Sequence, residues 1–395
     1  MRLTEVRTVL LTGPCTGDPW LSVFKQSRSA ALIEVRTGTG ETGLGETYAG
    51  YFFPESVPLI VEYLRPILLA AEDFEPGGLD VRGLVARMRT CFQFWGRVGL
   101  GAAVLAGIEA ALWDLAGKLA GLPVHRLLAE SAPAELPAYA TGGPSPWPVD
   151  DLLRKVEFYR GLGFEAVKLS SGYLDSATRS ERDCTVATEV DKLERLRAEF
   201  GTDLGILLDG HMGHREGESR WDVAAALPVL RALAGYNLIF FEEPLPYDDP
   251  SGYAVLHAAG PIPIAGGEQL TSDAEFAVFA FGVAQPDAAW LGIDAFTRVA
   301  ARFPRVAPHA WSAGVGVMQN VHAAFGVPNT LIVELPPAAG PLHTELWTLE
   351  TRGGRVVRPD EPGLGVHLPP GVEERYPFRP GAEEFSSVPG KLMRS

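Results

Sequence analysis

The sequence predicts an α/β protein in which a β/α barrel of the TIM type follows an N-terminal α+β domain. Two observations lead to this fold class. From about residue 135 onward, eight short apolar runs recur at intervals of roughly 20 to 35 residues, and most of them are separated by helix-like sequence. Polar residues follow many different runs, which is typical of a barrel whose active site gathers the carboxyl ends of several strands.

The N-terminal domain, which we expect to span residues 1–130, combines a hairpin with helices. Residues 29–47 contain two short β-rich runs around a Gly/Thr turn cluster, which predicts a hairpin. The clearest helix spans residues 101–121, and Gly121 followed by Pro123 marks its end. Its apolar side chains recur at helical spacing, at Leu105, Ile108, Leu112 and Leu115.

The barrel is expected over residues 131–340, because strands that alternate with helices predict parallel pairing. An open doubly wound sheet is the alternative, but it would carry a Gly-rich fingerprint after its first strand, whereas here polar residues follow many strands. Residues 341–395 are rich in Pro and Gly and are expected to pack back on the N-terminal domain. The eight predicted strands contain LPAYATG, AVKLS, GILLDGH, LIFFEEP, IPIAGGE, VAQPD, RVAPHA and LIVEL.

Composition limits the class of protein and of partner. The 395 residues are 46% hydrophobic and 21% charged, as in globular proteins, and no run approaches the roughly 18 uninterrupted apolar residues of a membrane span. Glu5 and Arg7 lie where a secretion signal would need its apolar core, so we expect a cytoplasmic protein. The net charge of −15 argues against nucleic acid and anionic membranes as partners. The three cysteines suggest neither a disulfide framework nor a zinc site.

Three consecutive predicted strands end in acids. Asp209 ends the third strand, Glu242 or Glu243 the fourth, and Glu268 the fifth. Carboxylates that converge on one edge of a barrel repel one another, so such a cluster normally holds a cation. Because all the donors are oxygens, the pattern favours Mg²⁺, with Mn²⁺ as the alternative, over zinc. Strand periodicity does not choose between Glu242 and Glu243, since neighbours point to opposite faces.

The second and third strands bring titratable nitrogen groups to the same edge. His211 lies two residues after Asp209, so both side chains face the mouth of the barrel if the strand continues through Gly210. His214 falls outside this alternation and is expected in a loop. Lys168 ends the second strand, and attraction to the nearby carboxylates would hold its side chain in the cationic form. It can bind a substrate carboxylate or contact the metal ligands.

The last three strands supply an aspartate, a histidine and a glutamate. Asp287 and His309 end adjacent strands and can form a hydrogen-bonded dyad, in which the carboxylate orients the imidazole and raises its basicity. Glu334 ends the eighth strand and could hydrogen-bond a substrate oxygen if it is protonated or bridged.

These residues, in this strand order, resemble the enolase superfamily, and within it the mandelate racemase/muconate lactonizing enzyme-like family. The resemblance covers most of the chain, including the helix that ends in LWDLAGKLAGLPVHRLL. It implies a modified (β/α)7β barrel, with capping-domain loops at 11–26 and 48–54 that close over the substrate. It also implies three groups of site residues: the metal ligands Asp209, Glu242 and Glu268, the catalytic residues His309, Asp287, His211, Lys168 and Glu334, and the substrate-binding residues Lys168, Glu334 and Trp311.

The resemblance implies abstraction of a proton α to a carboxylate, with Mg²⁺ stabilising the enediolate. Racemases of this kind commonly carry a Lys-x-Lys pair on the second strand, whereas this chain has Lys168 and Ser170, and serine is a poor base. His211 resembles the acid of several sugar-acid dehydratases. The leading hypothesis is a Mg²⁺-dependent hydro-lyase that removes the C2 proton through His309, loses the C3 hydroxyl with help from His211 or the metal, and forms a 2-keto-3-deoxy sugar acid.

Two alternatives stay open at this point. One is a cycloisomerase or a one-base epimerase or racemase of an acid sugar or lactone, which would use the same metal and the same dyad. The other is a non-catalytic barrel that serves as a binding or scaffold protein. The leading hypothesis makes the partner a small anionic sugar acid, and the resemblance implies a homo-oligomer, either a dimer or an octamer.

Overall fold

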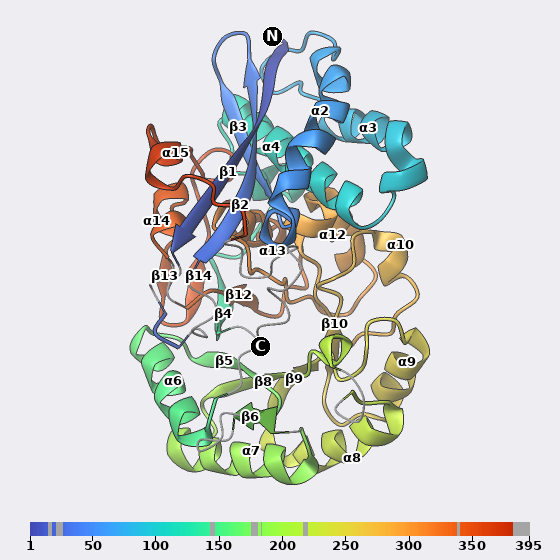
Figure 1. The fold of residues 1–395 in the computed structure, drawn as a ribbon, viewed down its shortest axis with the longest axis vertical. Helices are drawn as coiled ribbons and strands as arrows, with labels where there is room; N and C mark the ends of the chain where they lie inside the picture. The colour runs from blue at the N-terminus through green and yellow to red at the C-terminus, as the bar shows by residue number, and fades with distance from the viewer. Residues whose placement is uncertain are drawn as a thin grey trace.

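The chain has two main parts, a small antiparallel sheet with helices beside it and a ring of strands enclosed by helices (Figure 1). We call the first part the cap and the second the barrel. The ring is mainly parallel, which confirms the predicted fold class. The computed structural model describes residues 1–14, 18–20, 27–142, 147–174, 181–182, 184–215, 220–337 and 340–381.

The sheet of the cap has three antiparallel strands in the order β1-β2-β3. The predicted hairpin is present as β2 (Ser27–Thr37) and β3 (Thr42–Thr47). The sequence analysis did not predict β1 (Leu3–Pro14), which pairs with β2. The prediction of a loop over residues 11–26 was therefore wrong for its first four residues, which continue β1. Most of the other residues of this segment lie outside the described part of the chain.

The helices of the cap pack around α4 (Leu100–Ala120), whose bounds agree with the predicted helix. Gly121 ends α4 in the left-handed conformation, with φ of 66°. α4 is long and apolar enough to cross a membrane, yet 94% of its most apolar 18-residue stretch is buried inside the molecule. The other helical elements of the cap are α1 (Ala49–Phe52), η1 (Pro54–Ser56), α2 (Val57–Leu69), α3 (Val81–Gly96) and α5 (Val124–Leu128).

Two glycines let β3 lie directly against α4. A Cβ at Gly43 would be 2.1 Å from the carbonyl oxygen of Ala111, and one at Gly45 would be 2.2 Å from that of Gly107. Only a residue without a side chain permits this approach of strand and helix backbones. The contact fixes the position of Glu46, the next residue of β3, which reaches across to the barrel.

The barrel strands are parallel neighbours in the order β4-β5-β8-β9-β10-β11, and the last strand, β12, pairs with β4 to close the ring. One residue from each strand position fills the interior below the mouth: Tyr139, Ala166, Leu207, Phe240, Ala265, Val283, Ala307 and Ile332. The strands are β4 (Glu135–Thr141), β5 (Ala166–Ser170), β8 (Gly205–Asp209), β9 (Leu238–Glu242), β10 (Ile264–Gly266), β11 (Val283–Ala284) and β12 (Val333–Leu335).

The predicted seventh strand is reduced to one bridging residue. Val306 pairs in parallel with Ala284 on one side and with Thr330 on the other, and the residues around it are not assigned to a strand. Pro304 and Pro308 flank it, and proline has no N–H to donate to a strand ladder. His309 therefore lies on an irregular segment and not on a strand end.

Helices cover the outside of the ring, and Figure 1 shows four of them, α6 to α9, following one another around its rim. Their bounds are α6 (Val149–Gly161), α7 (Val186–Phe200), α8 (Val223–Leu233) and α9 (Pro250–Ala259). The remaining elements of this part are β6 (Tyr173–Leu174), β7 (Glu181–Arg182), η2 (Met212–His214), η4 (Ala234–Tyr236), α10 (Asp273–Phe276), α11 (Ala288–Leu291), α12 (Ile293–Ala300) and α13 (Val315–Phe325).

The segment after residue 340 contains more regular structure than the sequence suggested. Its elements are α14 (Pro341–Leu346), β13 (Thr351–Arg352), β14 (Arg355–Val357) and α15 (Val372–Arg375). β14 pairs with β4 and extends the barrel sheet, while Glu373 pairs with Arg7 of the cap. The described residues of this segment therefore contact both parts of the molecule. The domain boundaries at 130 and 340 stay predictions.

Candidate active site

Five ionisable side chains meet at the carboxyl ends of five strands. Parallel register places Asp209 opposite Glu242 at the ends of β8 and β9, so these two acids lie at the same level of the ring. Four of the five side chains are buried, and that of Glu268, two residues after β10, is 12% exposed. The five are Lys168 on β5, Asp209 on β8, Glu242 on β9, Glu268 after β10 and Glu334 on β12.

Lys168 lies at the centre of this group. Its Nζ is 2.8 Å from Glu242 Oε2, 3.3 Å from Asp209 Oδ2 and 3.2 Å from Glu334 Oε1. Burial disfavours the ammonium form, but attraction to Glu242 and Glu334 outweighs it and raises the pKa of Lys168 well above its ordinary value. The side chain is therefore a buried cation among the acids.

Asp209, Glu242 and Glu268 fit a divalent cation that prefers oxygen donors. Glu242 is fully buried, and among the described residues its Oε1 has no hydrogen-bond partner. Burial and the negative charge of Asp209 raise the pKa of Glu242 to about 8. Within the described ranges no group of three acid, His or Cys side chains already has the arrangement of a metal site. In this structure Lys168 pairs with Glu242, and His211 pairs with Asp209. The donor set and the unsatisfied oxygen suit Mg²⁺.

Glu242, and not its neighbour Glu243, joins the acid cluster. Glu243 is also buried, but its backbone is left-handed with φ of 42°, and its carboxylate accepts hydrogen bonds of 3.1 and 3.2 Å from Nε2 of Gln269. The turn at Glu243 directs the two carboxylates to different partners. The choice of Glu242 as a metal ligand, which the resemblance implied, stays a prediction.

His211 reaches the cluster by a route that differs from the predicted one. β8 ends at Asp209, and His211 has a left-handed backbone with φ of 43°, so the strand does not continue through Gly210. The turn still brings Nδ1 to 2.7 Å from Asp209 Oδ1 and Nε2 to 3.6 Å from Glu268 Oε1. Burial opposes the imidazolium, but Asp209 outweighs it and raises the pKa of His211 well above its ordinary value. The side chain of His214 lies outside the described residues.

His309 and Asp287 form a hydrogen-bonded pair, as the sequence predicted. Nδ1 of His309 lies 2.8 Å from Asp287 Oδ2, and Nε2 lies 3.4 Å from Glu268 Oε2. The other oxygen of Asp287 accepts the backbone N–H of Ala289 and Nδ2 of Asn320, each at 2.8 Å. Because Nδ1 donates to Asp287, Nε2 is the atom of His309 that can take up a proton.

The acids around His309 control its protonation. Burial opposes the charged imidazolium, but the carboxylates of Glu268 and Glu334 outweigh it and, with the bond to Asp287, raise the pKa of His309 to about 10. An imidazole with this pKa is protonated at neutral pH. A divalent cation on Glu268 would cancel part of the attraction and return the pKa towards the range in which His309 is a base.

Both oxygens of Glu334 are engaged within the protein. Oε2 accepts the backbone N–H of Ala310 at 2.8 Å, and Oε1 lies 3.2 Å from Lys168 Nζ. Glu334 therefore binds the backbone of Ala310, the residue after His309, and pairs with Lys168 at the centre of the cluster. Its predicted contact with a substrate oxygen stays a prediction.

Aromatic side chains of the cap lie over His309. The Tyr48 ring is 5.3 Å from the His309 ring and 5.2 Å from that of Tyr51, centroid to centroid. Trp311 donates its Nε1–H to the Tyr51 hydroxyl at 2.9 Å. Segment 48–54 thus contacts the site, but it is the helical turn α1 and the start of η1 and not a loop.

Several neighbours of the site were not identified from the sequence. Tyr48, Tyr51 and Arg28 come from the cap and carry no strand-end signal. Asn320 could have been identified from the sequence, because it is a polar residue in a largely apolar helical segment. In the structure it is fully buried on α13. Ser170, where racemases carry a second lysine, accepts a hydrogen bond from Lys192 Nζ through its backbone oxygen, and its buried Oγ has no partner among the described residues.

Comparisons with known proteins place this site in a family. Residues 151–372 match the family model described as enolase C-terminal domain-like, and residues 21–129 match the mandelate racemase/muconate lactonizing enzyme N-terminal domain. The chain is 30% identical over 358 residues to an arabinonate dehydratase of Saccharolobus solfataricus, with 87% of this chain and 89% of that protein covered. It is 29% identical to a 3,6-anhydro-α-L-galactonate cycloisomerase of Streptomyces coelicolor, with 85% and 88% covered.

A solved structure supports the same assignment and the metal. L-Talarate dehydratase from Polaromonas sp. JS666, in complex with Mg and L-glucarate, matches with a TM-score of 0.79 at 26% identity, over 95% of this chain and 98% of that one. Its bound Mg agrees with the oxygen-only donor set found here. One family model covers residues 151–372 of 395, the other covers most of the cap, and the strand-end acids have the expected order. The chain therefore belongs to the mandelate racemase/muconate lactonizing enzyme family of the enolase superfamily.

Proposed function

We propose that this protein is a Mg²⁺-dependent acid-sugar dehydratase, a hydro-lyase that converts a small sugar acid into a 2-keto-3-deoxy sugar acid. One observation carries the proposal: two imidazoles face the two oxygens of Glu268. His309 Nε2 is 3.4 Å from Oε2, and His211 Nε2 is 3.6 Å from Oε1. An elimination needs one group to take a proton and another to give one, and this pair supplies both. The dehydratases among the similar proteins support the same reaction.

His309 is the proposed base for the C2 proton. Its Nδ1 is held by Asp287, so Nε2 faces the space beside Glu268 where a substrate would lie. Lys168, cationic and buried among Glu242, Asp209 and Glu334, is placed to attract the substrate carboxylate. Bound by Asp209, Glu242 and Glu268, Mg²⁺ would neutralise the negative charge that develops on that carboxylate as the proton leaves.

His211 is the proposed acid for the departing hydroxyl. Burial opposes its charged form, but Asp209 outweighs the burial and raises the pKa of His211 well above its ordinary value, which favours the protonated imidazole. As the C3–O bond breaks, Nε2–H protonates the leaving oxygen and water departs. The resulting enol then becomes the 2-keto acid. Ser170 offers no second base on the lysine side, which argues against two-base racemisation.

A cycloisomerase is the second candidate, because similar proteins include a 3,6-anhydro-α-L-galactonate cycloisomerase and a D-galactarolactone cycloisomerase. Both reactions begin with loss of the C2 proton to the same base. A panel of aldonates, aldarates and their lactones, incubated with Mg²⁺ and trapped with semicarbazide, separates the two. Keto acid from a sugar acid supports dehydration; isomerised product from a lactone without keto acid from any sugar acid would replace it with the second candidate.

We further infer that the enzyme acts as a cytoplasmic homo-oligomer, a dimer or an octamer. Large apolar side chains stand exposed on the cap, and their burial between subunits would stabilise an assembly. Light scattering after size exclusion should give a mass of two or eight times 42.5 kDa, and a mass equal to one chain would contradict the inference. The exposed side chains are Leu59 and Tyr63 on α2 and Phe94 and Trp95 on α3.

A further inference from the structure

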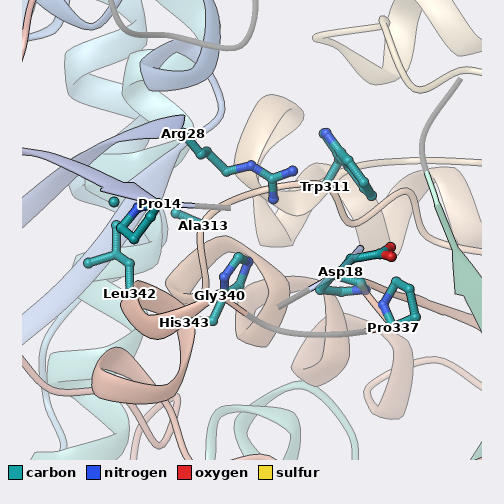
Figure 2. A pocket seen from close by; sticks show the side chains of 11 residues that line it. Pro14, Asp18, Arg28, Trp311, Ala313, Pro337, Gly340, Leu342 and His343 are labelled. Atoms are coloured by element: carbon teal, nitrogen blue, oxygen red, sulfur yellow. The ribbon is translucent and has the colours of Figure 1, made fainter. Parts of the chain in front are cut away.

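A small cavity lies between the cap and the barrel beside Trp311. Figure 2 shows Arg28 and Trp311 along its upper side, with Asp18 and His343 below them. Its volume is about 20 Å³, which is room for about one water-sized group. Its lining residues come from the cap, from the segment after His309 and from the segment after β12: Gly13, Pro14, Asp18, Arg28, Trp311, Ala313, Pro336, Pro337, Gly340, Leu342 and His343.

The cavity adjoins the catalytic base through aromatic contacts. Trp311 is two residues after His309 and is hydrogen-bonded to Tyr51 at 2.9 Å. Tyr51 stacks on Tyr48, which contacts the His309 ring. The cavity therefore lies near His309, on the side of the cap.

Arg28 supplies hydrogen-bond donors and a positive charge to the cavity. Its side chain is buried, with Cζ 4.4 Å from the centre of the Trp311 ring, and Nη1 donates to the backbone oxygen of Ser312 at 3.1 Å. Stacking on the indole fixes the plane of the guanidinium. The donors of Arg28 therefore have a defined direction at the cavity wall.

Asp18 supplies a fixed acceptor and a negative charge. It is 5% exposed, and its two carboxylate oxygens accept the hydroxyl of Tyr159 at 2.7 Å and the backbone N–H of Trp20 at 2.8 Å. Each carboxylate oxygen has a further lone pair. The charges of Asp18 and Arg28 balance one another within the cavity lining.

His343 adds a neutral acceptor. Its Nε2 lies 3.1 Å from the backbone oxygen of Ser312, and because a carbonyl oxygen only accepts, Nε2 carries the hydrogen and Nδ1 has the free lone pair. Burial and the charge of Arg28 lower the pKa of His343 to about 3, so it stays uncharged at neutral pH. The described lining residues thus offer both hydrogen-bond donors and acceptors.

We propose that this cavity receives the terminal hydroxyl group of the substrate and that Asp18 makes the enzyme prefer sugar monoacids to diacids with the same carbon chain. The inference rests on the proposed function. A hydroxyl group both donates and accepts, which matches Arg28 on one side and Asp18 or His343 on the other. A second carboxylate would be larger than the cavity and would lie beside Asp18, where like charges out of water repel.

The first experiment compares kcat/KM with Mg²⁺ for pairs that differ only at C6, gluconate with glucarate and galactonate with galactarate. We expect the wild-type enzyme to prefer the monoacid of an accepted pair by at least roughly tenfold, since like-charge contacts are costly. Asp18→Asn removes the charge, while its amide oxygen still accepts the Trp20 N–H and its amide N–H can donate to the Tyr159 hydroxyl. It should reduce this preference about tenfold. Asp248→Asn, which makes the same charge change at a side chain that is 70% exposed, should leave it unchanged.

A second variant shifts the preference in the opposite direction. Arg28→Gln removes the positive charge and leaves Asp18, so it should increase the preference for the monoacid while weakening binding of both acids. Shifts of the ratio in the same direction in Asp18→Asn and Arg28→Gln would overturn the proposal, because the charges would then not be its cause. An unchanged ratio in folded Asp18→Asn would overturn it as well.

Equilibrium binding separates this inference from the proposed function. Calorimetric titration of the wild-type protein with each acid in the presence of Mg²⁺ does not depend on turnover. Tighter binding of the monoacid, without keto acid from any sugar acid, would reject the dehydratase function and support the cavity assignment. Equal or tighter binding of the diacid would overturn the cavity assignment even if dehydration is observed.

Discussion

At the residue scale, His309 and His211 differ in the carboxylates that hold them. His309 donates Nδ1–H to Asp287, which is itself fixed by Asn320 and the N–H of Ala289. His211 pairs Nδ1 with Asp209, one of the proposed metal ligands. A cation bound by Asp209 and Glu268 would change the environment of both imidazoles, but only His309 would keep a carboxylate partner outside the metal site. This difference suits His309 to act as a base and His211 as an acid.

His309→Asn should lower kcat by about 10²–10⁴-fold, because the amide cannot accept the C2 proton. Asp287→Asn should cost less, since the imidazole remains and only its orientation and basicity suffer. Both kcat and exchange of the C2 proton in D₂O, followed by NMR, would measure the effect. Small and equal losses in the two variants would show that the pair does not act as a base.

His211→Asn should block elimination yet leave some exchange at C2, since His309 still removes the proton. The two steps would then be uncoupled: deuterium would enter the substrate while keto acid would not form. If the variant lost exchange and elimination together with Mg²⁺ still bound, His211 would be an essential base, and an epimerase would become the better description.

At the element scale, β3 and α13 hold the segment that carries His309. Glu46 of β3 accepts the backbone N–H of Ala313 through Oε1 and that of Gly316 through Oε2, each at 2.8 Å. Its own N–H donates to Gln319 Oε1 at 2.7 Å. These bonds are buried and join the cap to the loop between His309 and α13. A carboxylate suits this position because it accepts two N–H groups at once.

Glu46→Gln should loosen this loop without touching the substrate. The glutamine side chain has one oxygen acceptor and one NH₂ donor, so it can accept only one of the N–H groups of Ala313 and Gly316. The other N–H would face a donor and lose its bond, so the free energy of unfolding should fall by about 1–3 kcal/mol. We expect kcat to fall roughly tenfold with little change in KM, the sign of disturbed catalytic geometry. Glu41→Gln, in the turn of the same hairpin, is the matched control. Unchanged kcat and thermal stability in Glu46→Gln would refute the role.

Glu109 of α4 makes the packing of α4 against α12 sensitive to pH. Its Oε1 accepts the N–H of Asp294 at 2.7 Å, and burial, helped by the charge of Asp294, raises its pKa to about 7. Between the unfolded pKa near 4.3 and this value, the folded chain keeps a proton that the unfolded chain has released. The contribution of Glu109 to stability therefore falls as pH rises through that window.

Glu109→Gln should remove this dependence, because the amide accepts the same N–H and never ionises. The variant should match the wild type near the unfolded pKa and exceed its free energy of unfolding by about 1–3 kcal/mol at pH 8. Denaturant unfolding at both ends of the window measures the difference, with the exposed Glu157→Gln on α6 as control. Parallel pH profiles for wild type and Glu109→Gln would refute the assignment.

At the scale of the whole molecule, the acid cluster should make the stability of the folded chain depend on Mg²⁺. Glu242 has a pKa of about 8 because burial and Asp209 disfavour its charge, so the fold holds a carboxylate that a cation would stabilise. A ligand that binds only the folded chain stabilises it by about 2.7 kcal/mol at 100 times its Kd. Mg²⁺ should therefore stabilise the folded chain against unfolding.

Addition of Mg²⁺ should raise the Tm of the wild-type protein, and a chelator should reverse the rise. Glu242→Gln should lose most of this shift because it removes an anionic ligand. Glu243→Gln makes the same change one residue along and should keep the shift, since Glu243 bonds to Gln269 instead. A full Mg²⁺ shift in Glu242→Gln and none in Glu243→Gln would reverse the assignment. Absence of any shift in the wild type would reject the metal site.

The sequence by itself determined the fold class and most of the acid cluster. Alternation along each strand and the spacing of the strands are local properties, and a closed parallel barrel brings all its strand ends to one mouth. Asp209, Lys168 and Glu334 therefore lie where their places in the predicted strands put them, whereas periodicity left the choice between Glu242 and Glu243 open. Asp287 and His309 also meet as predicted, although prolines reduce the seventh strand to Val306.

Only the tertiary structure decided how the cap completes the site. The left-handed turn at His211, the Tyr48 ring over His309 and the bonds of Glu46 to the loop before α13 have no local pattern in the sequence. Arg28 and Trp311, which share the small cavity, lie far apart in the chain. Such contacts depend on how the two parts of the molecule pack against each other. The periodicity that predicts a strand or helix contains no information about which residues of another part will face it.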